Sequence, residues 1–121
     1  MRGIVIISHA KEIAVGVKAL IEEVAKDVPI TLAGGLDGGL IGTSFDDIQQ
    51  AIESNEADEL FVFYDLGSAK LNVEMVIELS QKSITICDVA LVEGAYIAAA
   101  LLQTDVDNDV IFDNLAPLNI K

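Results

Sequence analysis

Apolar runs alternate with segments of helical periodicity along most of this chain. The first run, Gly3 to Ser8, consists mainly of Ile and Val and predicts a buried strand. In the next segment, 11–26, apolar residues recur every three or four positions, at Ile13, Val17, Leu20, Ile21 and Val24. This spacing predicts an amphipathic helix that packs one face against a sheet.

Three further strand and helix units follow. The pattern predicts strands over 30–33, 60–64 and 84–87, and helices over about 45–54, 69–81 and 92–103. Ser44 is suited to cap the first of these helices. In the predicted helix over 69–81 the apolar positions are Leu71, Met75, Val76 and Leu79. The tail, 105–121, predicts one or two helical turns and then an extended edge segment around Pro117.

This alternation, with short connections, predicts right-handed crossovers between parallel strands. We therefore expect one three-layer α/β/α domain over residues 1–121, with a mainly parallel four-stranded central sheet. The tail after about residue 103 stands outside the repeating pattern. Strands covered on both faces also account for a hydrophobic share of 52%.

The net charge and the lengths of the apolar segments exclude some classes of function. Seven Lys and Arg residues oppose twenty Asp and Glu, and a net charge of −13 excludes nucleic-acid binding. The longest apolar stretch, Ala95–Leu102, is too short for membrane insertion. No cleavage pattern of a signal peptide follows Met1. Cys87 has no second cysteine to pair with, which fits a reducing cytoplasm.

The only histidine, His9, directly follows the first predicted strand, and Asp65 follows the third. The carboxyl ends of parallel strands meet at one edge of the sheet, where such proteins place their chemistry. A carboxylate that accepts one ring N–H leaves the other nitrogen free to attack an electrophile. Each residue alone also fits a structural role, His9 as a helix cap and Asp65 as a turn residue.

Glycine-rich segments at the same edge are candidate anion sites. The loop over 34–44 holds five of the nine glycines, and its backbone N–H groups and hydroxyls can surround a phosphoryl group. The candidates are Gly38, Gly39, Gly42, Thr43 and Ser44, together with Gly67 and Ser68 at the start of a later helix. A flexible loop and a simple helix cap explain the same residues. No Lys stands between Gly42 and Thr43, so this is not a Walker loop.

Other chemistries fit poorly. Asp105, Asp107 and Asp109 alternate as in a calcium loop, but Val110 replaces the required glycine and Ala116 the closing glutamate. One His and one Cys do not make a zinc site, so no metal is expected. A hydrolase triad from Ser8 fails because adjacent strand residues point to opposite faces. A receiver domain needs an acidic pair where Ser8 and His9 stand.

Four segments in order resemble one family: Val5–His9, Gly34–Ser44, Asp65–Ala69 and Leu91–Ala95. They look like the phosphoryl-carrier subunits of bacterial dihydroxyacetone kinases (DhaM), which are similar to mannose-type EIIA domains of the phosphoenolpyruvate-dependent phosphotransferase system. The resemblance spans residue 1 to about residue 103. It implies the EIIA-like fold and a phosphotransferase that serves dihydroxyacetone and glycerol metabolism.

The resemblance also implies roles for residues and partners. HPr would phosphorylate His9 on the ring nitrogen distal to Asp65, and Asp65 would orient the ring. His9 would then pass the group to ADP in the nucleotide-binding kinase subunit, with no permanently bound cofactor. A cytoplasmic homodimer is expected, for which the Ala95–Leu102 face is a possible interface, although packing within the monomer explains that face equally well. Two alternatives stay open: a mannose-type EIIA that passes phosphate to EIIB, and a non-catalytic anion-binding regulatory domain.

Overall fold

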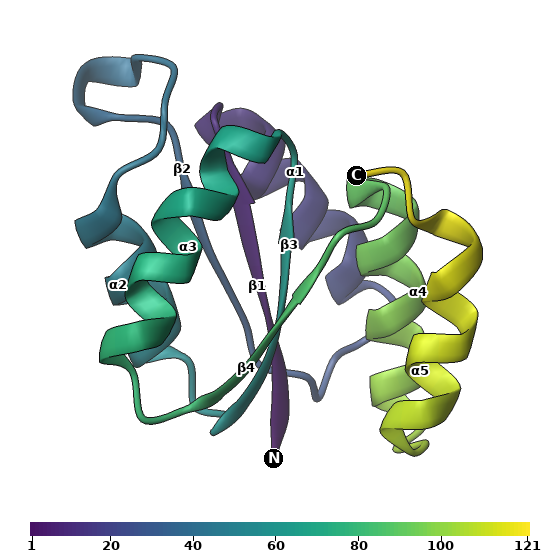
Figure 1. Cartoon of the computed structure of the whole chain (residues 1–121). Coiled ribbons are helices and arrows are strands. Elements are labelled where there is room, and N and C mark those ends of the chain that lie inside the picture. The colour runs from purple at the N-terminus through teal and green to yellow at the C-terminus, as the bar shows by residue number, and fades with distance from the viewer.

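A computed structural model describes all 121 residues and shows a four-stranded sheet between two layers of helices (Figure 1). The strands are β1 (Arg2–Ser8), β2 (Ile30–Gly34), β3 (Glu59–Tyr64) and β4 (Ser83–Cys87). All neighbours are parallel, in the order β2-β1-β3-β4. The predicted α/β class and the four-stranded parallel sheet are therefore confirmed.

Five α-helices cover the two faces of the sheet. They are α1 (Lys11–Glu22), α2 (Phe45–Ser54), α3 (Gly67–Leu79), α4 (Leu91–Gln103) and α5 (Asn108–Leu115). Helices α2 and α3 lie on one face, and α1, α4 and α5 lie on the other (Figure 1). None of the helices is long and apolar enough to cross a membrane.

Helix boundaries agree closely with the sequence pattern, with one clear exception. Ser44 caps α2 as predicted, because its hydroxyl accepts a hydrogen bond from the backbone N–H of Asp47. Helix α1 was expected to reach residue 26 but ends at Glu22. The backbone N–H groups of Glu23, Val24 and Ala25 bond to carbonyls three residues earlier, so tight turns replace the last helical turn.

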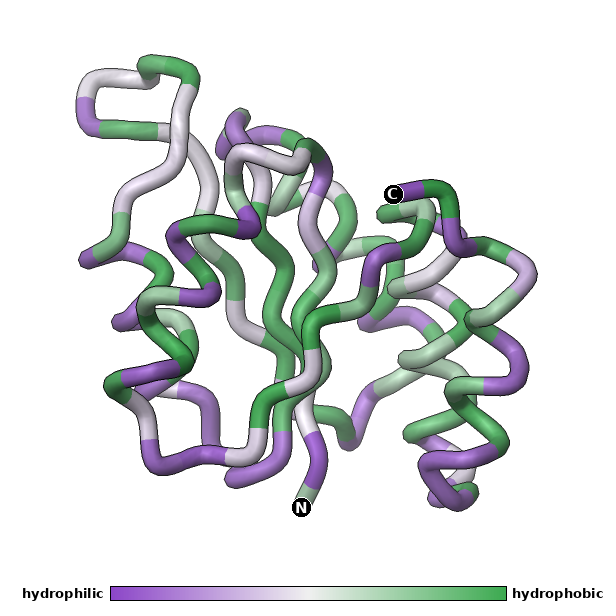
Figure 2. Tube along the Cα trace, in the orientation of Figure 1, coloured by the Kyte–Doolittle hydropathy of each residue, from purple (hydrophilic) through white to green (hydrophobic).

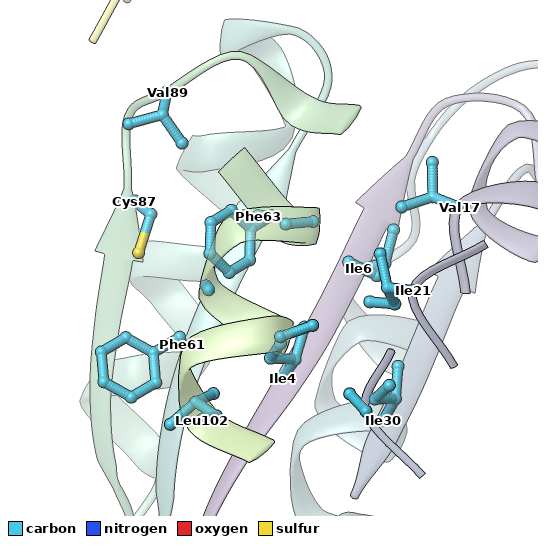
Figure 3. Packing of buried hydrophobic residues seen from close by; sticks show 14 of the residues in the cluster. Ile4, Ile6, Val17, Ile21, Ile30, Phe61, Phe63, Cys87, Val89 and Leu102 are labelled. Carbon is cyan, nitrogen blue, oxygen red and sulfur yellow. The ribbon is translucent and has the colours of Figure 1, made fainter. Parts of the chain in front are cut away.

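The strands separate two cores because alternate side chains point to opposite faces of the sheet. Toward α1, α4 and α5 lie Ile4, Ile6, Ile30, Phe61, Phe63 and Cys87 (Figure 3). Toward α2 and α3 lie Val5, Ile7, Ala33, Leu60, Val62 and Tyr64. The central strands are accordingly hydrophobic along most of their length (Figure 2). Each fully buried aliphatic side chain of this kind stabilises the fold by roughly 1.5–3 kcal/mol.

The predicted apolar face of α1 was partly wrong, and most of the large apolar residues noted in α3 do not form its inward face. In α3 the inward residues are Ala69, Val73 and Val76, whereas the exposed ones are Leu71, Met75 and Leu79. In α1 the inward residues are Ala14, Val17 and Ile21, whereas Ile13 and Leu20 are about half exposed. Small and β-branched side chains let both helices approach the sheet closely, so the larger residues turn outward.

Two expectations about the C-terminal third also need correction. The Ala95–Leu102 face is the inner face of α4, where Ala95, Ala98 and Ala99 are fully buried within the monomer, so it is not free for a dimer contact. The segment around Pro117 is a 3-10 turn, Ala116–Leu118, rather than extended chain. The fixed φ of proline suits the start of a helical turn. Only Asn119 forms a β-bridge, to Val89.

The strand order creates a switch point between β1 and β3. The chain leaves β1 toward β2 at one edge, and it leaves β3 toward β4 at the other. The connections after these two central neighbours therefore run in opposite directions, the arrangement at which open α/β sheets commonly bind their ligands. The residues that follow β1 and β3 are placed side by side there.

Two helical glycines provide a matched stability test. A Cβ added at Gly94 of α4 would overlap with Val89 Cγ2, whereas one added at Gly16 of α1 meets nothing within 4 Å. We expect Gly94→Ala to destabilise the protein by about 1–3 kcal/mol, because the clash outweighs helix propensity. Gly16→Ala should stabilise it by about 0.5–1 kcal/mol. Urea unfolding of both variants measures these differences, and a stabilised Gly94→Ala would contradict this packing.

Candidate active site

His9 and Asp65 meet at the switch point, where the ends of β1 and β3 lie side by side. The ring Nδ1 of His9 is 2.9 Å from Asp65 Oδ1, and the two side chains are only 16% and 14% exposed. The expected pairing of these two residues is thus present in the geometry. The ring is held at a fixed position but keeps access to solvent.

Asp65 receives four hydrogen-bond donors. Its Oδ1 accepts from His9 Nδ1 and from the backbone N–H of Leu66 at 2.7 Å. Its Oδ2 accepts from the Ser8 hydroxyl at 2.8 Å and from the backbone N–H of His9 at 2.9 Å. Burial alone would raise the pKa of this carboxyl group, but these donors outweigh it and lower the pKa below its usual value. Asp65 is therefore an anion throughout the neutral pH range.

An ionised carboxylate only accepts hydrogen bonds, so Nδ1 of His9 carries a proton. In the neutral ring, Nε2 then has the free lone pair. The Ser68 hydroxyl lies 2.7 Å from Nε2 and is placed to donate to it. Ser68 is in the first turn of α3, where helix N–H groups lack intrahelical partners and the helix dipole favours an anion. The nucleophilic nitrogen thus faces an anion-stabilising helix start.

The C-terminal part of the glycine loop is attached to the site, whereas its tip is not. The backbone N–H of Gly42 donates to the His9 carbonyl at 2.8 Å. Gly38 and Gly39 occupy a 3-10 turn with positive φ values at the loop tip and line an open groove beside β2. His9 does not line that groove. Neither glycine makes a hydrogen bond with His9 in this structure, and their part in an anion cradle stays a prediction.

The two hydroxyls after the loop already have structural partners. Thr43 Oγ1 accepts a hydrogen bond of 3.0 Å from Asn72 Nδ2, which joins the loop to α3. The Ser44 hydroxyl serves as the cap of α2. Among the predicted phosphate-binding residues, Ser68 alone makes a direct hydrogen bond with the His9 ring, and Gly67 begins the same helix.

Sequence reasoning missed the roles of two residues at this site, Ser8 and Asn72. Ser8 is fully buried, and its hydroxyl both donates to Asp65 and accepts from the N–H of Ala10. The position of Ser8 next to His9 at the strand end was the sequence feature that could have identified its role. Asn72 stands one helical turn after Ser68, and that i, i+4 spacing could have placed both on one face of α3.

The arrangement supports nucleophilic chemistry at a nitrogen atom. It holds an imidazole whose Nδ1–H is bound by a carboxylate, whose Nε2 is directed at a hydroxyl and whose position is fixed by backbone hydrogen bonds. No group of three or more His, Cys, Asp and Glu side chains gathers as a metal site. Such an imidazole can accept and release an electrophilic group such as a phosphoryl group.

Comparison with known proteins agrees with this chemistry. The chain matches the EIIA-man family model, described as the PTS system fructose IIA component, over residues 3–112. It is 54% identical to the PEP-dependent dihydroxyacetone kinase 1 phosphoryl donor subunit DhaM of Listeria innocua, covering 98% of this chain and 96% of that protein. It is 51% identical to the PTS-dependent dihydroxyacetone kinase phosphotransferase subunit DhaM of Lactococcus lactis, covering 98% and 97%.

Similarity extends to a longer relative and to a solved structure. The DhaM subunit of Escherichia coli is 34% identical over all of this chain, which corresponds to 28% of that protein. The crystal structure of the unknown function protein EF1359 superposes with a TM-score of 0.84 at 29% identity, covering 99% of this chain and 96% of that one. The chain therefore belongs to the EIIA-man family and, within it, to the DhaM phosphoryl donor subunits of dihydroxyacetone kinases.

Proposed function

We propose that this chain is a phosphohistidine carrier of the phosphotransferase system that serves a dihydroxyacetone kinase, with His9 as the phosphorylated residue. The observation that carries the assignment to His9 is the clamp on its ring: Nδ1 bonds to Asp65 at 2.9 Å, while Nε2 faces Ser68 at 2.7 Å. The DhaM relatives that cover nearly the whole chain support the carrier role.

In the proposed reaction HPr is the donor. The lone pair of His9 Nε2 attacks the phosphorus atom of the donor's phosphohistidine, and the N–P bond of the donor breaks as the new N–P bond forms. The electron pair of the broken bond stays with the donor imidazole. The proton on Nδ1 remains shared with Asp65, whose negative charge offsets the positive charge that develops on the ring.

Gly67 and Ser68 then bind the phosphoryl oxygens. The hydroxyl that contacts Nε2 in the free ring can rotate to donate to an oxygen once the N–P bond forms. The unpaired N–H groups of the first turn of α3 supply further donors. Phosphoryl transfer requires mainly positioning and charge stabilisation, which these groups provide.

The acceptor in this proposal is ADP bound in the nucleotide-binding kinase subunit, which then phosphorylates dihydroxyacetone. The carrier itself holds no permanent cofactor, only the phosphoryl group in transit. We extend the proposal to a single phosphotransfer domain over residues 1–121 and to a homodimer in the cytoplasm. The family resemblance supports the dimer, and sedimentation of the purified chain measures its oligomeric state.

Replacement of the single histidine tests the carrier role directly. Incubation with phosphoenolpyruvate, Enzyme I and HPr should label the protein with a phosphate that is acid-labile and base-stable. His9→Ala should abolish the label while circular dichroism stays unchanged, since the ring is only a peripheral part of the fold. A label that persists in His9→Ala, or that moves to Asp65, contradicts the proposal.

The identity of the acceptor can be tested with the labelled wild-type protein. Mixing it with the ADP-loaded kinase subunit should remove the label and produce ATP. A mannose-type EIIB should remove it much more slowly. Faster transfer to EIIB would favour the transporter branch, and transfer to neither partner would favour a regulatory domain.

Asp65→Asn tests the orienting role of the carboxylate. An amide offers one acceptor oxygen and one NH2 donor, so either the pair of donors at Oδ1 or the pair at Oδ2 loses its acceptor. The His9 ring is then free to adopt the other tautomer. We expect the rate of phosphorylation by HPr to fall by roughly 10²- to 10⁴-fold. Rapid-quench measurement of the rate checks this, and an unchanged rate would remove the proposed role.

Ser68→Ala tests the hydroxyl that faces Nε2. Loss of one donor to the transferring group should lower the phosphorylation rate by about 10- to 100-fold, with little change in thermal stability. Ser83→Ala is the matched control, because Ser83 is exposed at the opposite end of the sheet. Equal rates for the two variants would exclude a role for the Ser68 hydroxyl in transfer.

A further inference from the structure

Two of the few cations in this acidic chain gather beside the phosphoryl-carrying site. Lys70 lies in the first turn of α3, and Lys121 follows the last turn of the tail. The end of the chain lies at the same end of the sheet as the loop after β4 (Figure 1). The chain has seven basic residues against twenty acidic ones. The positions of the basic side chains therefore determine where an added negative charge can be stabilised.

The tail is held in place before it reaches the site. The backbone N–H of Ala90 donates to the carbonyl of Leu118 at 3.0 Å, and Asn119 pairs with Val89 in an antiparallel bridge. These contacts fasten the tail to the loop between β4 and α4. The bridge therefore fixes the backbone near Lys121, which follows it by only two residues.

The ammonium group of Lys121 contacts the end of β3. It donates a hydrogen bond to the carbonyl of Tyr64, the residue before Asp65, and lies 4.3 Å from the centre of the Tyr64 ring. Burial lowers the pKa of this ammonium group, while attraction to Asp65 and Asp88 opposes that effect. Lys121 thus interacts electrostatically with the same carboxylate that holds His9.

Asp88 alone does not neutralise Lys121, because Asp88 also has other partners. Asp88 already accepts a hydrogen bond of 2.5 Å from the Tyr64 hydroxyl and pairs with Lys70 at 3.0 Å. Around the site, the carboxylates of Asp65 and Asp88 lie near the ammonium groups of Lys70 and Lys121, and Glu74 of α3 adds a further negative charge near Tyr64. A phosphoryl group on His9 adds a charge of about −1.5 to −2 to this surrounding. Without Lys121 the site would carry a larger excess of negative charge even before phosphorylation.

We propose that Lys121 is a positioning residue of the phosphoryl-carrying site, which holds the backbone before Asp65 and offsets the charge of the phosphohistidine. This inference rests on the proposed function of His9. The cation acts through the field it creates and through the Tyr64 carbonyl. Its loss should therefore disfavour the phosphorylated state more than it disfavours folding.

The test measures the equilibrium between phospho-HPr and the phosphorylated protein at low salt. Lys121→Met should lower the phosphorylated fraction, with the equilibrium constant reduced about three- to tenfold. Lys121→Arg keeps the charge and should restore most of the loss. Lys26→Met is the matched control, because Lys26 is 75% exposed and pairs only with Glu23 at 3.8 Å; its equilibrium constant should stay near that of the wild type.

Salt separates an electrostatic role from a merely structural one. The deficit of Lys121→Met should shrink as ionic strength rises from about 0.01 M to 1 M, because screening removes the advantage of the wild-type cation. A deficit that is independent of salt, a failure of arginine to rescue, or equal values for Lys121→Met and Lys26→Met would overturn the role of Lys121. Those outcomes leave His9 as the carrier, whereas an unlabelled wild-type protein overturns both proposals.

Discussion

The carboxylate of Asp65 is the constraint on which the rest of the site depends. It accepts two hydrogen bonds from His9, one from Ser8 and one from Leu66, so the ends of the two central strands are joined through a single anion. Charge-assisted bonds of this kind are about twice as strong as neutral ones. The tautomer of His9, the direction of Nε2 and the entry into α3 all follow from this one group.

The order of the strands explains why such a group can exist. Because the chain turns outward in opposite directions after β1 and β3, the residues that follow the two strands meet between the two connections. The side chains of Ile4–Ile7 on β1 and of Leu60–Phe63 on β3 are fully buried, so the strand ends cannot shift without disturbing two cores. The packed sheet supplies the rigidity, and the partial exposure of the His9 side chain supplies access. His9 stands where these two requirements meet.

The sequence predicted the fold and the chemical pair well, for physical reasons that also define its limits. Strands buried on both faces read as continuous apolar runs, and parallel strands bring His9 and Asp65 to one edge. The large apolar residues of α3 do not mark its inward face, because Ala69 and Val73 allow a closer approach to the sheet than Leu71 and Met75 would. The position of Lys121 near Asp65 could not be predicted from the sequence, because it depends on the path of a tail that has no periodic pattern.

A carrier must stabilise its phosphoryl group and still release it, and the distribution of donors around His9 suits both needs. The groups closest to Nε2 are neutral, a hydroxyl and the helix start at Ser68, which can bind oxygens without a permanent ion pair. The positive charge of Lys121 lies instead beside the carbonyl of Tyr64, the residue before Asp65. Charge held at that position favours phosphohistidine formation through space, while the oxygens themselves stay open to the cationic groups of a partner.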